Sequence, residues 1–151
     1  MLKFIGDGLL AVFPIADAAA ADDAAERAFT AACQALARIA DIAANPPALL
    51  SDIDGWQPVR SGLALHMGEV FFGNIGSPTR LDFTVIGPAV NAAARVEALT
   101  KELKRPLLVT APVAALLKDE LDALGSFDLR GIREPVGVFA PPLTDQNNES
   151  K

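Results

Sequence analysis

The sequence predicts a single α+β domain with a mostly antiparallel sheet. Its 151 residues suit one domain, and a hydrophobic content of 51% is enough for one core. Short apolar runs typical of strands come in neighbouring pairs, and alanine-rich segments with helical spacing separate these pairs. The expected order of elements is therefore β-β-α-β-β-β-α-β-α-β-β.

The first part of the chain predicts a hairpin followed by a long helix. Residues 2–5 and 9–13 are β-prone runs, and the Gly6-Asp7-Gly8 sequence between them is typical of a tight turn. Residues 16–44 carry apolar side chains at helical spacing, with several acids near the positive N-terminal end. Asn45-Pro46-Pro47 ends this helix.

The rest of the chain predicts strands, two further helices and a polar tail. Residues 48–57 are expected to form a loop. A helix opened by a proline is expected at 88–102, and another at 111–123, with Thr110 as its N-cap. Residues 144–151 are expected to be a disordered tail. The expected strands are residues 59–67, 70–74, 81–86, 107–109, 127–129 and 136–140.

The composition argues against several classes of function. A net charge of −6 and a pI near 4.7 make broad nucleic-acid binding a poor expectation. No apolar run reaches the roughly 18 residues that a membrane-spanning helix needs, so no membrane contact is expected from this segment. The single cysteine, Cys33, cannot form an internal disulfide, which fits a cytoplasmic protein.

Two groups of residues could carry chemistry. Asp7 is a carboxylate held between glycines, which suits a hard cation, although such a sequence alone is more often only a turn. Asn91 and Arg95 are four residues apart on the expected helix, with alanines between them. They could bind a sugar oxygen and a phosphate together, although a solvated arginine and a structural asparagine are more common at this spacing. His66 is expected to be structural.

In combination, these segments resemble the catalytic domain of the class III nucleotidyl cyclases, the adenylate and guanylate cyclase family. The resemblance runs from Lys3 to about Ala140 and implies a cyclase-type, ferredoxin-like sheet with helices packed on it, over residues 1–143. The motifs that carry it are Lys3-Phe4-Ile5-Gly6-Asp7, Gly62-Leu63-Ala64-Leu65-His66-Met67-Gly68, Gly73-Asn74-Ile75-Gly76, Asp82-Phe83-Thr84-Val85-Ile86-Gly87, Val90-Asn91-Ala92-Ala93-Ala94-Arg95 and Leu129-Arg130-Gly131.

The resemblance implies that ATP is cyclised to 3′,5′-cyclic AMP and pyrophosphate in intracellular signal transduction. Two Mg²⁺ or Mn²⁺ ions would activate the attacking hydroxyl and neutralise the triphosphate. The family works as a head-to-tail homodimer with its active sites at the interface, so a monomer is not expected to turn over. Apolar surface around Phe71 and Phe72 is expected to serve that interface.

The resemblance also implies roles for six residues. Asp7 matches the second of two metal-binding aspartates, and Lys3 matches a lysine that selects adenine. Thr84 matches the second purine-selecting position, where threonine marks a bacterial subgroup and its hydroxyl can accept from adenine. The other three matches are Asn91 to the ribose-orienting asparagine, Arg95 to the arginine at the α-phosphate, and Arg130 to a triphosphate-binding lysine.

The first metal-binding aspartate of the family belongs to an opening strand upstream of Lys3. We therefore expect a domain without its opening strand-helix portion, and little or no activity from these residues alone. The alternatives are a non-catalytic nucleotide-binding or dimerising remnant, and a guanylate cyclase. A nucleic-acid-binding α+β domain is a weaker alternative, because the chain is acidic and poor in aromatic residues.

Overall fold

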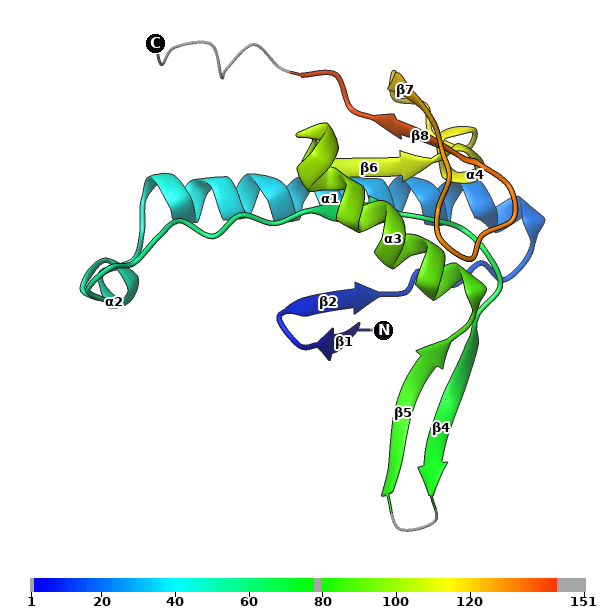
Figure 1. The fold of residues 1–151 in the computed structure, drawn as a ribbon, viewed down its shortest axis with the longest axis horizontal. Coiled ribbons are helices and arrows are strands. Elements are labelled where there is room, and N and C mark those ends of the chain that lie inside the picture. The colour runs from blue at the N-terminus through cyan, green and yellow to red at the C-terminus, as the bar shows by residue number, and fades with distance from the viewer. Residues whose placement is uncertain (1, 78–79, 144–151) are drawn as a thin grey trace.

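The computed structural model describes residues 2–77 and 80–143 (Figure 1). The tail expected at 144–151 lies outside the described residues. The elements, in chain order, are β1 (Leu2–Ile5), β2 (Gly8–Ala11), a single 3-10 turn (Ala18–Ala20), α1 (Ala21–Ala44), α2 (Ala48–Ser51), β3 (Leu63–Leu65), β4 (Phe71–Ser77), β5 (Arg80–Ile86), α3 (Pro88–Leu103), β6 (Leu107–Thr110), α4 (Ala111–Ala114), β7 (Asp122–Phe127) and β8 (Val136–Ala140).

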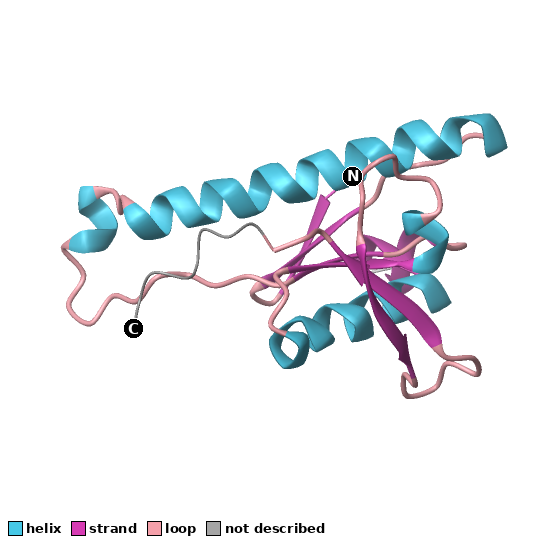
Figure 2. Ribbon diagram, turned by 90° about the horizontal axis from the view of Figure 1, so that it is seen from above, coloured by secondary structure: helices cyan, strands magenta, loops and turns pink. Residues whose placement is uncertain are grey.

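A four-stranded sheet forms the centre of the molecule, with the strand order β3-β6-β8-β7. Strand β3 pairs with β6 in parallel, whereas β6, β8 and β7 pair in antiparallel fashion. The sheet lies between α1 and α3, as Figure 2 shows. The predicted α+β class with a mostly antiparallel sheet is therefore confirmed.

Strand β6 is buried on both faces, which explains its unbroken apolar sequence. Leu107 and Val109 pack against a cluster that includes Phe29 of α1. Leu108 faces the other way and packs with Val96 of α3, and both side chains are fully buried. Because full burial of one such side chain stabilises the fold by about 1.5–3 kcal/mol, β6 is the strand that holds the two helices together.

Two hairpins form sheets of their own. Strands β1 and β2 pair with each other, as do β4 and β5. The β4–β5 hairpin extends away from the body of the molecule (Figure 1), and near its base Phe71 and Phe72 are each 68% exposed. The first hairpin and both strands of the second were expected from the sequence, with ends that differ by no more than three residues.

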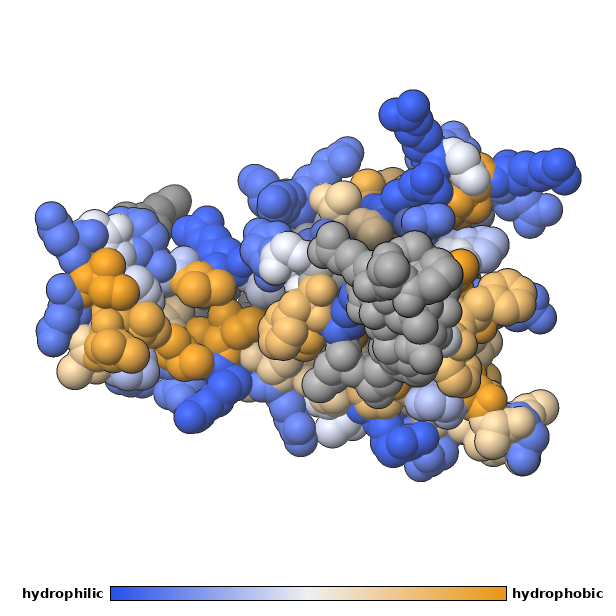
Figure 3. Space-filling model, turned by 90° about the horizontal axis from the view of Figure 1, so that it is seen from below, coloured by the Kyte–Doolittle hydropathy of each residue, from blue (hydrophilic) through white to orange (hydrophobic). Residues whose placement is uncertain are grey.

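An apolar surface lies at the α2 end of the molecule, opposite the sheet (Figure 3). On α2 and in the segment that follows it, the exposed large apolar side chains are Leu49, Ile53 and Val59. The first of these belongs to α2, a single helical turn within the segment that the sequence predicted to be a loop.

No helix in the described residues has both the length and the apolar character needed to span a bilayer.

Two predictions for the C-terminal part were wrong. The helix expected at 111–123 ends after one turn, at Ala114, and residues 122–127 form β7 instead. Pairing with β8 overrides the local helical preference. Residues 122–127 gain backbone hydrogen-bond partners from β8, and this gain depends on the sheet and not on the local sequence. The strand expected at 127–129 is therefore only the last residue of β7 and the start of a turn.

The expected cap and the first expected strand of the central part were also wrong in detail. Thr110 occupies the N-cap position of α4, as predicted, but its side chain makes no capping bond, and its hydroxyl donates to the Leu65 carbonyl instead. The strand expected at 59–67 is reduced to Leu63–Leu65. Its short length follows from β6, which offers partners for only those three residues.

Candidate functional site

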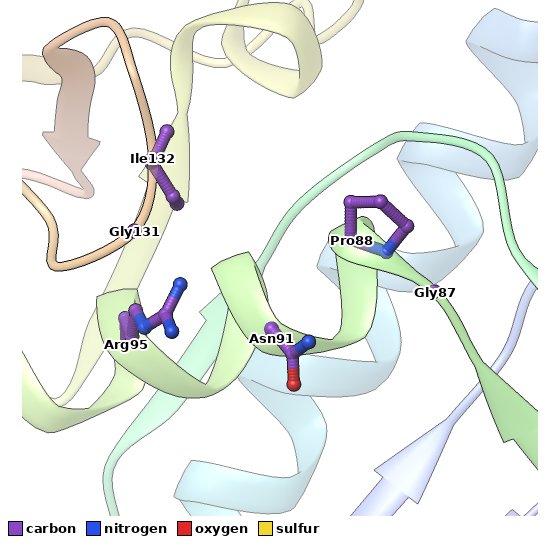
Figure 4. Close-up of a pocket in the computed structure, with 6 residues that line it drawn as sticks. All are labelled: Gly87, Pro88, Asn91, Arg95, Gly131 and Ile132. Atoms are coloured by element: carbon purple, nitrogen blue, oxygen red, sulfur yellow. The ribbon is translucent and has the colours of Figure 1, made fainter.

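A hollow of about 440 Å³ lies beside the N-terminal half of α3 (Figure 4). Its walls come from two segments, the start of α3 and the turn that follows Leu129. The residues that line it are Gly87, Pro88, Asn91, Arg95, Gly131 and Ile132. The structure thus places Asn91 and Arg95, predicted to share a helix face, in the wall of one cavity.

The start of α3 is fixed by its contact with the segment that leads into β4. Gly87 has φ +149, and a Cβ there would lie 3.0 Å from the Glu69 carbonyl oxygen. Only glycine combines that conformation with so close an approach. Pro88 then occupies the first helical turn, and the bond from the Asn91 N–H to the Gly87 oxygen is 3.5 Å long. The partial positive charge at the N-terminal end of α3 favours an anion in the hollow.

Arg95 brings a positive charge into the hollow. Its side chain is half-buried, and in the described part of the chain it forms no ion pair or side-chain hydrogen bond. The guanidinium lies toward the turn that carries Gly131 (Figure 4). Arg130 is exposed on the same turn. A half-buried guanidinium with open donors suits an anion such as phosphate, because its forked donors match phosphate oxygens.

Four predicted site residues do not line the hollow: Arg130, on the turn beside it, and three residues on the hairpins. Lys3 lies on β1, opposite Leu10, and is half-buried. Asp7 is exposed in the β1–β2 turn. Thr84 lies on β5, opposite Gly73, and is half-buried. One chain therefore brings together Asn91, Arg95 and the turn of Arg130, while the other three residues lie on the two hairpins.

Asp7 offers the oxygen ligands that Mg²⁺ and Mn²⁺ prefer. Within residues 2–77 and 80–143, however, no three His, Cys, Asp or Glu side chains lie close enough to hold a metal ion. The described residues thus supply one suitable carboxylate and not a complete ligand set.

His66 has a structural partner, as expected. Its Nδ1 lies 3.1 Å from the Thr110 hydroxyl oxygen, which in turn donates to the Leu65 carbonyl at 3.3 Å. Because that hydroxyl has only one proton, Nδ1 of His66 is the donor to Thr110. Partial burial lowers the pKa of His66, which favours this neutral form.

Sequence reasoning did not identify the glycine and isoleucine that form the second wall. Gly131 has φ +74, and a Cβ there would lie 3.5 Å from Nη2 of Arg95. Ile132 is half-buried and donates its N–H to the Leu129 carbonyl at 2.9 Å. The glycine directly after the basic residue 130 was a usable signal for a turn. That Gly131 lies beside Arg95 could be learned only from the fold.

Comparison with known proteins finds cyclases. No protein-family model matches the chain. The chain is 34% identical over 136 residues to an adenylate cyclase of Anabaena cylindrica, covering 90% of this chain and 25% of that protein. It is 35% identical over 86 residues to the photoactivated adenylate cyclase subunit beta of Euglena gracilis, covering 54% of this chain and 10% of that protein. The chain thus spans a quarter or less of the length of these relatives.

A solved structure has the same fold over nearly the whole chain. The crystal structure of the guanylyl cyclase Cya2 matches with a TM-score of 0.70 and 24% identity, covering 98% of this chain and 73% of that one. At this identity the likeness concerns the arrangement of helices and strands.

Proposed function

We propose that the chain is a class III nucleotidyl cyclase domain of the adenylate cyclase type, which forms 3′,5′-cyclic AMP and pyrophosphate from ATP. The adenylate cyclase relatives and the fold shared with a guanylyl cyclase support a class III cyclase domain. The observation that carries the finer proposal is the hollow in which Asn91 and Arg95 lie one helical turn apart.

In this proposal the hollow receives the phosphate end of the nucleotide. Arg95 donates to oxygens of the α-phosphate, where negative charge develops as the ribose 3′-oxygen attacks. Asn91 orients the ribose through its amide, and Arg130 holds the outer phosphates. The open donors of Arg95 and the N-terminal end of α3 supply positive potential on the same side of the cavity.

The purine would be selected by Lys3 and Thr84. A lysine can donate to the N1 acceptor of adenine, and a threonine hydroxyl can accept from its amino group. This pair favours ATP over GTP. A guanylate cyclase remains the alternative substrate class, and it predicts cyclic GMP as the product.

A head-to-tail homodimer would combine the two sets of residues. In the family that the chain resembles, one subunit supplies the metal-binding aspartates, here Asp7. The other subunit supplies the second set, here Lys3, Thr84, Asn91 and Arg95. The exposed Phe71 and Phe72 offer apolar surface for such an interface.

Asp7 is proposed as one ligand of the Mg²⁺ or Mn²⁺ ions. When bound, such ions lower the pKa of an attacking hydroxyl and neutralise phosphate charge. Further oxygen ligands are needed beyond this single carboxylate, and the nucleotide phosphates are natural contributors.

The test is cyclic nucleotide production with Mn²⁺-ATP and Mn²⁺-GTP. It uses the chain itself and a version extended by a strand containing Phe-x-Asp, the opening strand that the resemblance implies. We expect cyclic AMP from the extended version, and a loss of roughly 10²–10³ in kcat on Arg95→Ala. Arg38→Ala is the matched control, because Arg38 lies on α1, is 76% exposed and pairs with Asp41 on its own helix.

Two outcomes separate the alternatives. An extended chain that makes only cyclic GMP would identify a guanylate cyclase. ATP-analogue binding or self-association without any turnover would support the non-catalytic remnant, because such a domain binds nucleotide or dimerises but does not catalyse cyclisation.

A further inference from the structure

We infer that Gly131 is a positioning residue, whose bare backbone gives the Arg95 guanidinium a defined space at the place where the hollow accepts a phosphate. This inference rests on the proposed function, and specifically on the assignment of Arg95 to a phosphate. It concerns a residue outside the six that the sequence singled out.

The guanidinium of Arg95 lies beside Gly131, at the place where a side chain at 131 would begin. A Cβ at position 131 would lie 3.5 Å from Nη2, 3.7 Å from Nη1 and 3.9 Å from Cζ. All three atoms at the end of the arginine are thus at van der Waals range of the same point. The absence of a side chain at 131 leaves both terminal nitrogens open to the hollow, as their orientation in Figure 4 illustrates.

The turn that carries Gly131 is anchored to the core that also holds α3. Leu129 is 7% exposed and belongs to the same cluster as Val96, the residue after Arg95. Ile132 packs against this cluster and closes the turn through its hydrogen bond to Leu129. Because both sides of the contact are fixed to one cluster, the distance between Gly131 and Arg95 is set by the fold.

The position of Gly131 has an energetic role because arginine is flexible. A free arginine side chain loses rotamer entropy when it binds a ligand. In the described part of the chain no carboxylate holds the Arg95 guanidinium. A neighbouring turn that limits the orientations of this side chain in advance reduces the entropy lost when a phosphate binds.

Substitutions at 131 have two effects that rank the variants in opposite orders. At φ +74 a backbone strain is expected for any residue with a Cβ, and it is smaller for asparagine than for alanine. The steric effect on Arg95 depends instead on the size of the new side chain at 131. An alanine methyl would touch the guanidinium at ordinary contact distance, whereas the longer asparagine side chain would displace it. Stability and phosphate binding should therefore respond differently.

The experiment measures binding of inorganic triphosphate to the full chain by calorimetry, with urea unfolding of every variant. We expect Gly131→Ala to weaken binding by roughly threefold and Gly131→Asn by roughly tenfold, whereas Gly131→Ala is the less stable variant. Gly55 provides the matched control, because it also has φ +74 and a Cβ there would meet nothing within 4 Å. Gly55→Ala and Gly55→Asn should bind triphosphate as the unmodified chain does.

A double-mutant cycle shows whether Gly131 acts through Arg95. In an Arg95→Ala background, Gly131→Asn should cause no further loss of the residual triphosphate binding. An equal loss in both backgrounds would overturn the inference, as would a Gly131→Asn variant that binds like the unmodified chain. Absence of triphosphate binding by the unmodified chain would instead contradict the phosphate role of Arg95, and so remove the proposed function of the hollow together with this inference.

Discussion

Gly68 should be a position where one added methyl group displaces the first turn of α3. A Cβ at 68 would lie 2.9 Å from the Ala89 Cβ and 3.5 Å from Nε2 of His66. Two such carbons are comfortable at about 3.5–4.0 Å, so Gly68→Ala requires a shift of about 1 Å. The Gly68 backbone lies outside the left-handed range. The expected cost is therefore steric and does not come from a strained φ.

The expected destabilisation is about 1–3 kcal/mol, the usual range for overpacking. This is a large part of a typical domain stability of about 5–15 kcal/mol, and it should move the urea midpoint by on the order of 1 M. Gly73→Ala is the matched control, because a Cβ at 73 would meet nothing within 4 Å and its φ is also ordinary. Its stability should stay within about 0.5 kcal/mol of the unmodified chain.

Removal of the opposing methyl should relieve the clash. Ala89→Gly alone should cost up to about 1 kcal/mol through helix propensity, and the Gly68→Ala/Ala89→Gly pair should be barely less stable than Ala89→Gly. The predicted coupling is favourable by about 1–2 kcal/mol in urea unfolding. Strict additivity of the two changes would refute the steric explanation and show that α3 does not depend on the bare Gly68 backbone.

Two further predictions concern other polar contacts. Burial lowers the pKa of His66 in the folded chain, so the unfolded chain takes up a proton more readily. The free energy of unfolding should therefore keep its full value above about pH 6.5. Below that pH it should fall by at most about 1.4 kcal/mol per pH unit. His66→Gln should fall less over this window in paired urea titrations, and identical slopes would contradict the role of burial. Arg105 is 11% exposed and bonds both to Asp122, at 2.7 Å, and to the Pro141 carbonyl. Arg105→Ala should therefore lower the free energy of unfolding by about 2–3 kcal/mol in the same assay. Asp122→Asn, which changes the half-exposed partner, should lower it clearly less. Equal losses would show that the ion pair, and not the bond to the carbonyl, dominates.

The parts of the fold that the sequence predicted well are those in which local pattern and packing agree. The hairpin turn at Asp7 has glycines on both sides, and Gly6 adopts φ +62 there. The helix α3 starts at a glycine and a proline, as predicted, and ends at Lys104 in the left-handed conformation. These signals are local, so no knowledge of distant residues was needed to read them.

The parts that the sequence predicted badly depend on partners distant in the chain. Residues 122–127 have no strong strand pattern, and they form β7 because β8 lies alongside. Thr110 had the sequence features of a helix cap, yet its hydroxyl reaches Leu65, which is 45 residues away. Such pairings are decided by the packing of the sheet, which local propensity does not contain.

The motif around β3 shows how a sequence pattern can be informative without itself being a binding site. Gly62 and Gly68 flank this strand, and both lie against α3: a Cβ at Gly62 would approach Thr100 Oγ1 to 2.1 Å, and one at Gly68 would approach Ala89. The two glycines therefore let the helix lie close to the strand at both of its ends. Because α3 carries Asn91 and Arg95, these contacts also determine where the wall of the hollow stands. The pattern is therefore informative through the distance that it imposes on a helix, and Gly131 on the other wall likewise leaves room beside that helix for the Arg95 guanidinium.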